Sequence, residues 1–148
     1  MLSVEINTAI KSHFSSLGSP YSLATIHPLF AYDNTSAPFI VYSEFEGTLS
    51  EEQYFVKVSN LIYNIYDNNI SRMKDIAYQL DLFMNVGDSV SGIKQALSSP
   101  SASYGQSRYR LTSCRKTSGA TFPPIEREGF SSQSLNFRAI YINEENAV

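Results

Sequence analysis

Four carboxylates crowd around one short turn and form the densest group of possible metal or proton-transfer residues in the chain. Glu44, Glu46, Glu51 and Glu52 flank the turn at 47–50. Carboxylate loops that bind Ca²⁺ place their oxygen ligands and a turn glycine at set positions. This loop has neither the ligand order nor the glycine position of an EF-hand. We therefore interpret it as a solvated hairpin tip between two strands.

A second group of charges is basic. Arg108, Arg110, Arg115 and Lys116 fall within a stretch that holds no acid, although the whole chain has a net charge of −3. A stripe of this kind can contact phosphate backbones or an acidic partner surface. It can also be the solvated face of a strand, and both interpretations remain open.

No recognisable catalytic constellation accompanies these charges. The chain has no glycine-rich phosphate loop, no Cys and His cluster and no nucleophile motif. His13 and His27 lack a second ligand at metal spacing. The single Cys114 lies in an alternating, strand-like segment, which favours an inert thiol. We therefore predict that the protein is not an enzyme and binds no metal and no cofactor.

Length and composition bound the class of protein. The 148 residues fit one domain, 1–148, because such a chain can bury one core but is short for two. A single cysteine excludes an internal disulfide framework and suits a reducing compartment. The N-terminus lacks a signal-peptide pattern, and no apolar run approaches the roughly 20 residues of a membrane helix. We expect a soluble protein that is made in a cytoplasm.

Two stretches have the apolar spacing of amphipathic helices. The first covers about 4–17, with Ser3 as its N-cap, and its apolar face is formed by Leu2, Ile6, Ile10, Phe14 and Leu17. The second covers about 70–84, and its stripe is formed by Ile70, Met73, Ala77, Leu80 and Met84. We expect Asn68, Asn69 or Ser71 to cap its start and Asn85 or Gly87 to end it. The width of this second stripe predicts packing against a sheet.

Alternating residues predict four strands, near 39–45, 54–66, 108–114 and 134–142. The first strand has apolar residues on both faces, so we expect a cover on each side. The second changes its alternation near Ser59–Asn60, which predicts a β-bulge there. Together these elements predict an α+β fold, in which two main helices pack on one face of a mostly antiparallel sheet.

The remaining segments are predicted to be edges, loops or arms. Residues 21–32 are interrupted by Pro28, which cannot donate to a β-ladder, so they indicate an edge or irregular segment. Residues 98–107 indicate a loop. Residues 115–132, rich in Gly and Pro, predict a long irregular arm. We expect this arm and the acidic hairpin at 44–52 to contact partners and to be mobile in the free subunit.

The order of elements carries one resemblance. An N-terminal helix precedes the strand Ala37-Pro38-Phe39-Ile40-Val41-Tyr42. A second strand ends in Asn64-Ile65-Tyr66-Asp67-Asn68, and a long helix and a late hairpin follow. This order resembles the tail terminator (tail completion) proteins of long-tailed bacteriophages. The resemblance covers residues 1–86 well and residues 108–142 more loosely.

Several expectations follow from this resemblance. It implies a structural virion protein of the phage tail and neck that forms a homohexamer ring. Such a ring caps the tail tube, ends its polymerisation and provides the interface to the head connector. The implied partners are other copies of the chain, the tail tube protein and the head–tail connector protein, while DNA passes through without specific binding.

The charged residues can be given roles in such a ring. A strongly basic channel would hold DNA through its phosphates rather than let it slide. We therefore expect the basic residues to face a neighbouring subunit or an acidic tail partner. Their counterparts across that interface are the four glutamates of the hairpin.

Two other interpretations stay open. One is a head-side neck or connector component, or a tail tube subunit; a tube subunit polymerises alone, whereas a terminator halts at one ring. The other is a small ligand-binding α/β domain or enzyme with its site in a cleft. A thermal shift with a specific small molecule would favour that interpretation.

Overall fold

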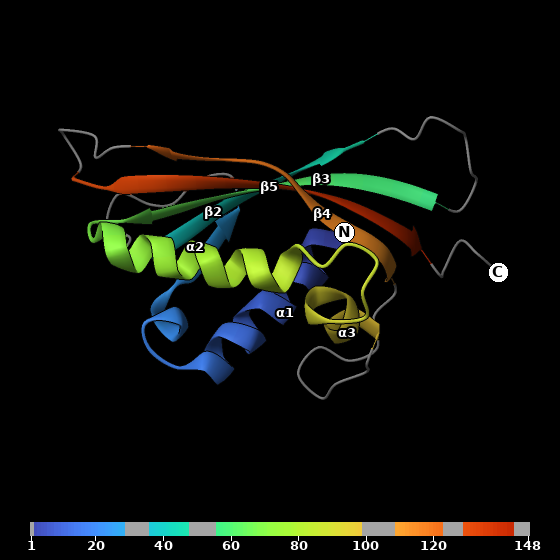
Figure 1. The fold of residues 1–148 in the computed structure, drawn as a ribbon, viewed down its shortest axis with the longest axis horizontal. Helices are drawn as coiled ribbons and strands as arrows, with labels where there is room; N and C mark the ends of the chain where they lie inside the picture. Colours follow the sequence, from blue (N-terminus) through green and yellow to red (C-terminus); the bar gives the residue numbers. More distant parts are fainter. Residues whose placement is uncertain (1, 29–35, 48–55, 99–108, 123–128, 144–148) are drawn as a thin grey trace.

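The computed structural model describes residues 2–28, 36–47, 56–98, 109–122 and 129–143. The elements of this part, in chain order, are α1 (Leu2–Leu17), the 3-10 helix η1 (Tyr21–Leu23), β1 (Thr25–Pro28), β2 (Phe39–Glu46), β3 (Val56–Asp67), α2 (Ile70–Met84), α3 (Gly92–Ser98), β4 (Tyr109–Phe122) and β5 (Ser131–Asn143). Figure 1 shows a two-layer arrangement in which the α-helices lie on one side of the sheet. The predicted α+β class is confirmed.

The sheet has the strand order β1-β2-β3-β5-β4. The pair β1–β2 is parallel, and the other three pairs are antiparallel. The two edges of the sheet are therefore β1 and β4. The predicted edge segment is confirmed for Thr25–Pro28, which ends at the proline. Residues 29–32 of that prediction lie outside the described part of the chain.

The core lies between the helices and one face of the sheet, which we call the helical face. The buried side of α1 carries Ile6, Ile10 and Phe14, and that of α2 carries Met73, Ile76 and Leu80. They share one cluster with the strand residues Leu61, Tyr63, Ile65, Leu135 and Phe137. Each large apolar side chain that is buried there contributes about 1.5–3 kcal/mol to the free energy of folding. Both predicted helical stripes therefore contribute to the core, except for their terminal residues Leu17 and Ile70, which are exposed.

The predicted caps agree with the structure for α2 and disagree with it for α1. Asn69 caps α2 as expected, since its side-chain oxygen accepts a hydrogen bond from the Arg72 backbone N–H at 3.1 Å. Asn85 follows the last residue of α2, also as expected. Ser3 does not cap α1, because this helix already includes Leu2. Instead the Ser3 backbone N–H donates to Oε2 of Glu44 on β2, at 3.3 Å. The first turn of α1 is therefore bound by a carboxylate of the neighbouring strand β2, whereas the sequence predicted a cap by the Ser3 side chain.

The predicted arm at 115–132 is wrong for most of its length. β4 continues to Phe122, and β5 begins at Ser131, so only 123–128, outside the described residues, and the short 129–130 separate them. β4 has register shifts between Leu111 and Ser113 and between Lys116 and Ser118, and the second of them disturbs the alternation in the part of the strand that was not predicted. The hairpin β4–β5 is therefore longer than the sequence pattern predicts.

The predicted bulge near Ser59–Asn60 is also wrong. Every residue of β3 from Val56 to Asp67 pairs in register with β5. The apparent change of phase arises because the strand is apolar on opposite faces at its two ends: Val58 points away from the helices, whereas Leu61 points toward them. The bulges lie in β4 instead.

The opposite face of the sheet, which we call the open face, bears no helix in the described part of the chain (Figure 1). Val58 on this face is nevertheless buried, so a second cover of another kind than helices stays a prediction. The sequence also missed α3, whose seven residues are too few to show a helical period. This helix buries Ile93 and Leu97 and packs against α1 and β4.

Candidate interaction surface

The structure gives Glu44 a role within its own chain. Its carboxylate accepts hydrogen bonds from the Ser3 backbone N–H at 3.3 Å and from the Ser59 hydroxyl at 2.8 Å. A carboxylate beside the first turn of α1 is favourably placed, because a helix N-terminus carries partial positive charge. Glu46 is exposed near the end of β2. Glu51 and Glu52 lie outside the described residues, so partner contact by this group stays a prediction.

Two of the four predicted basic residues also have partners in their own chain. Arg115 Nη2 lies 2.9 Å from Asp88 Oδ2, and Lys116 Nζ lies 3.0 Å from Asp81 Oδ2. Both carboxylates belong to α2 or to the segment that follows it. Arg108 lies outside the described residues, and Arg110 is exposed. Contact of the stripe with a partner protein stays a prediction.

The strands separate charges between the two faces of the sheet. Arg110, Arg115 and Arg138 lie opposite Ile142 or each other, which places them on the open face. Glu44, Glu46 and Asp67 lie opposite Leu61, Ser59 and Ser131, which places all three on the helical face. Among the described strand residues, the charges of the open face are therefore all basic.

Apolar side chains alternate with small polar ones along the open face. The apolar positions include Val41, Phe45, Ile62, Ile140 and Ile142, and the polar ones include Ser43, Asn60, Asn64, Ser134 and Asn136. Phe45 is 55% exposed. One face of an antiparallel sheet is often solvated, but a row of partly exposed apolar residues is also what a protein partner covers. The sequence contained this signal as the two-sided apolar pattern of β2.

An aromatic group lies at one end of the open face. The ring of Phe39 stacks on that of Tyr66 with centroids 5.1 Å apart, and Phe130 meets Phe39 edge-on at 5.5 Å. Such pairs stabilise a fold by about 0.5–1.5 kcal/mol beyond the area they bury. This end of the open face is therefore stiffened by its own side chains.

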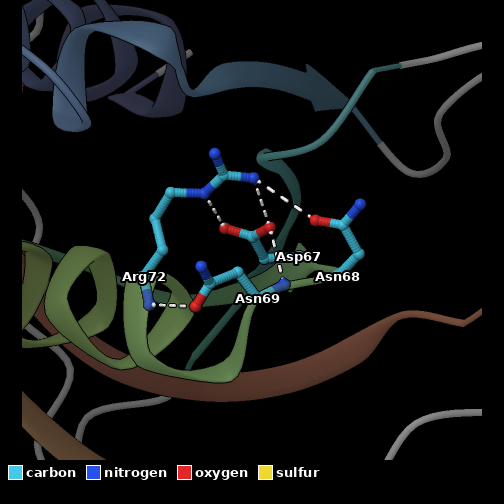
Figure 2. A network of polar contacts seen from close by, with 4 residues as sticks. All are labelled: Asp67, Asn68, Asn69 and Arg72. Carbon is cyan, nitrogen blue, oxygen red and sulfur yellow. Dashed lines mark hydrogen bonds and ion pairs between the residues drawn. The ribbon is translucent and has the colours of Figure 1, made fainter.

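Figure 2 shows the most buried charge of the described residues, Asp67 at the end of β3. Its carboxylate accepts hydrogen bonds from Arg72 Nε and Nη2, both at 2.6 Å, and from the Asn69 backbone N–H at 3.1 Å. The hydrogen bonds that the Arg72 guanidinium donates to Asp67 raise the pKa of Arg72. A buried acid can mark a reactive site, but this one is already paired. It fixes the angle at which α2 leaves β3, and only the cap residues around it were visible in the sequence.

The remaining titratable candidates are structural. Burial raises the pKa of the Cys114 thiol to about 12, which agrees with an inert cysteine. His13 stacks on Phe83 with ring centroids 4.4 Å apart, and burial lowers its pKa. Within the described ranges, no three His, Cys, Asp or Glu residues are grouped so as to hold a metal ion. None of the helices described here has the length and apolar character to cross a membrane.

Comparison with known proteins supports a shared fold. No protein-family model matches this chain, and no curated protein is similar to it in sequence. One solved structure with a similar chain is described as "Virion of native gene transfer agent (GTA) particle". The likeness has a TM-score of 0.60 and covers 91% of this chain and 93% of that chain. At 12% sequence identity it shows that the two chains share a fold.

Proposed function

We propose that this chain is a structural protein of a phage-like virion and that it acts there as a tail terminator. Copies of the chain, six in number, form a ring that caps the tail tube, ends its polymerisation and provides the interface to the head connector. DNA passes through this ring without specific binding. The protein is made in the host cytoplasm and ends in the tail and neck of the particle.

One observation carries the proposal: the fold likeness to a virion chain spans nearly the full length of both chains. A partial likeness would have allowed a shared motif inside unrelated proteins. The order of elements adds support, because the sequence resembles tail terminators over residues 1–86. The step from fold to role is an analogy, since one fold serves many functions.

The two-layer architecture is compatible with a ring. In a closed ring each subunit contacts its two neighbours through two different patches. This molecule has two different surfaces with exposed or partly exposed apolar side chains. The open face presents Phe45 and Ile62, whereas α2 exposes Tyr78 and Leu82 on the helical side. The open face is the surface that we expect a neighbouring subunit to cover.

Sedimentation velocity of the purified protein over a wide concentration range tests this role. A terminator should reach at most one closed ring, whereas a tube subunit would grow into long polymers. The substitution Phe45→Asp should prevent ring formation and leave the circular dichroism spectrum unchanged. Leu23→Asp, at a similarly exposed apolar residue of η1, is the matched control and should assemble normally. Unlimited polymers, or equal effects of both variants, would contradict the proposal.

A further inference from the structure

The outer edge of β4 is partly covered by residues 85–88, which we call the strap. The Gly87 N–H donates to the Cys114 carbonyl at 2.7 Å, and the Cys114 N–H donates to the Gly87 carbonyl at 3.2 Å. The Lys116 N–H donates to the Asn85 side-chain oxygen at 3.0 Å. These three bonds occupy outward-pointing backbone groups of an edge strand. Such groups, when left open, are a template for pairing with another chain.

Side chains also hold the strap: Val86 packs against the core cluster, and Lys94 Nζ donates to the Asp88 carbonyl at 2.9 Å. The ion pair of Arg115 with Asp88 joins side chains that are 60% and 76% exposed, so water and salt weaken it. Lys116 reaches back to Asp81 on α2, beside the strap. Against β4 itself, the strap is held by hydrogen bonds to the β4 backbone. An incoming strand could offer the same kind of bond in their place.

Two glycines set the path of the strap. Gly87 has φ +59° and Gly92 has φ +51°, values that side-chain-bearing residues rarely adopt. A Cβ at Gly92 would lie 2.4 Å from the Phe83 carbonyl oxygen. The chain can therefore turn out of α2, run along β4 and enter α3 only because both positions lack a side chain. The sequence thus encodes the covered edge in its glycines.

We propose that the strap prevents β4 from pairing edge to edge with β4 of a second copy of this chain. β4 has fourteen residues, whereas the other edge strand, β1, has four and ends at Pro28, which has no N–H to donate. β4 is therefore the edge able to support a long strand pairing. Two antiparallel copies of it can satisfy each other's backbone groups about a two-fold axis. The inference does not depend on the ring, for which we expect the open face to contact the neighbouring subunit.

The substitution Gly87→Pro tests this by removing one donor of the strap and the φ that its path requires. Hydrogen exchange at the Cys114 and Lys116 amides should become about tenfold faster or more in the monomer, and self-association should tighten by about tenfold or more. Adding Asn85→Ala should strengthen both effects. Thr117→Lys, which places a charge on the same edge, should suppress the association.

Leu80→Ala is the control for general instability, because Leu80 is a core residue of α2 outside the strap. It should lower stability and leave the association state unchanged. The inference is overturned if the strap variants expose the two amides and keep the same association state as the parent protein. It is also overturned if the amides stay protected in the double variant, or if Leu80→Ala associates equally.

Discussion

Removing Arg72 should cost more stability than removing its partner Asp67, although both variants delete the same ion pair. The Asp67 side chain is 0% exposed, whereas that of Arg72 is 28% exposed. In Arg72→Ala the carboxylate stays buried with the Asn69 N–H as its remaining donor among the three contacts described above. In Asp67→Ala the guanidinium can turn toward water. The two substitutions therefore leave different groups unpaired.

The magnitudes follow from this asymmetry. Removing one partner of a buried pair costs about 3–5 kcal/mol when the other charge stays buried, which is our expectation for Arg72→Ala. Losing charge-assisted hydrogen bonds costs about 1.5–3 kcal/mol when the partner can be rehydrated, which is our expectation for Asp67→Ala. The double variant should be more stable than Arg72→Ala alone, because it no longer buries an unpaired carboxylate.

Urea unfolding followed by far-ultraviolet circular dichroism measures these differences as changes in the free energy of unfolding. Lys74→Ala, at an exposed cation on the same helix, is the control and should stay within about 0.5 kcal/mol of the parent. The reasoning is refuted if Arg72→Ala costs less than Asp67→Ala. It is equally refuted if the double variant is less stable than Arg72→Ala.

Three further predictions concern single residues. Gly18→Ala should cost about 1–2 kcal/mol for left-handed backbone alone, and Gly92→Ala clearly more because its Cβ meets the Phe83 carbonyl; equal costs in urea unfolding would contradict this. Because burial lowers the pKa of His13, the unfolded chain binds its proton more readily, so stability should fall as pH drops below about 6.5. His13→Gln should flatten that slope, and an unchanged slope would count against it. Cys114 should react with a thiol reagent at pH 8 only after unfolding, since its pKa is about 12; rapid reaction of the native protein would show the burial to be wrong.

The sequence predicted the elements whose signal is local and repeated. The stripes of α1 and α2 extend over several turns, and β2 begins with the continuous apolar run Phe39–Tyr42, so their positions agree with the structure. Only the first half of β4 was predicted, because the register shift between Lys116 and Ser118 disturbs the alternation of the second half. α3 was not predicted because it has only two buried large apolar residues, Ile93 and Leu97, which are too few to form an apolar stripe in the sequence. In both cases contacts with distant parts of the chain, which local patterns do not contain, decide the structure.

The charged candidates were found as groups, but the roles of their side chains were not. Arg115 and Lys116 form a basic run in the sequence, yet their carboxylate partners lie 27 and 35 positions earlier in the chain. Glu44 was grouped with its hairpin neighbours, whereas the fold brings it to the start of α1. The sequence thus shows where charged residues are grouped along the chain, whereas the fold decides which of them form ion pairs and hydrogen bonds.

The proposal that the protein caps a tail tube is tested most directly by negative-stain imaging of tail tubes with and without the purified protein. The tubes should come from the particle that carries this chain. We predict one ring at one end of each tube, and tubes so capped should no longer lengthen when tube subunits are added. Bare tube ends that continue to grow, or protein distributed along the tube walls, would contradict the account.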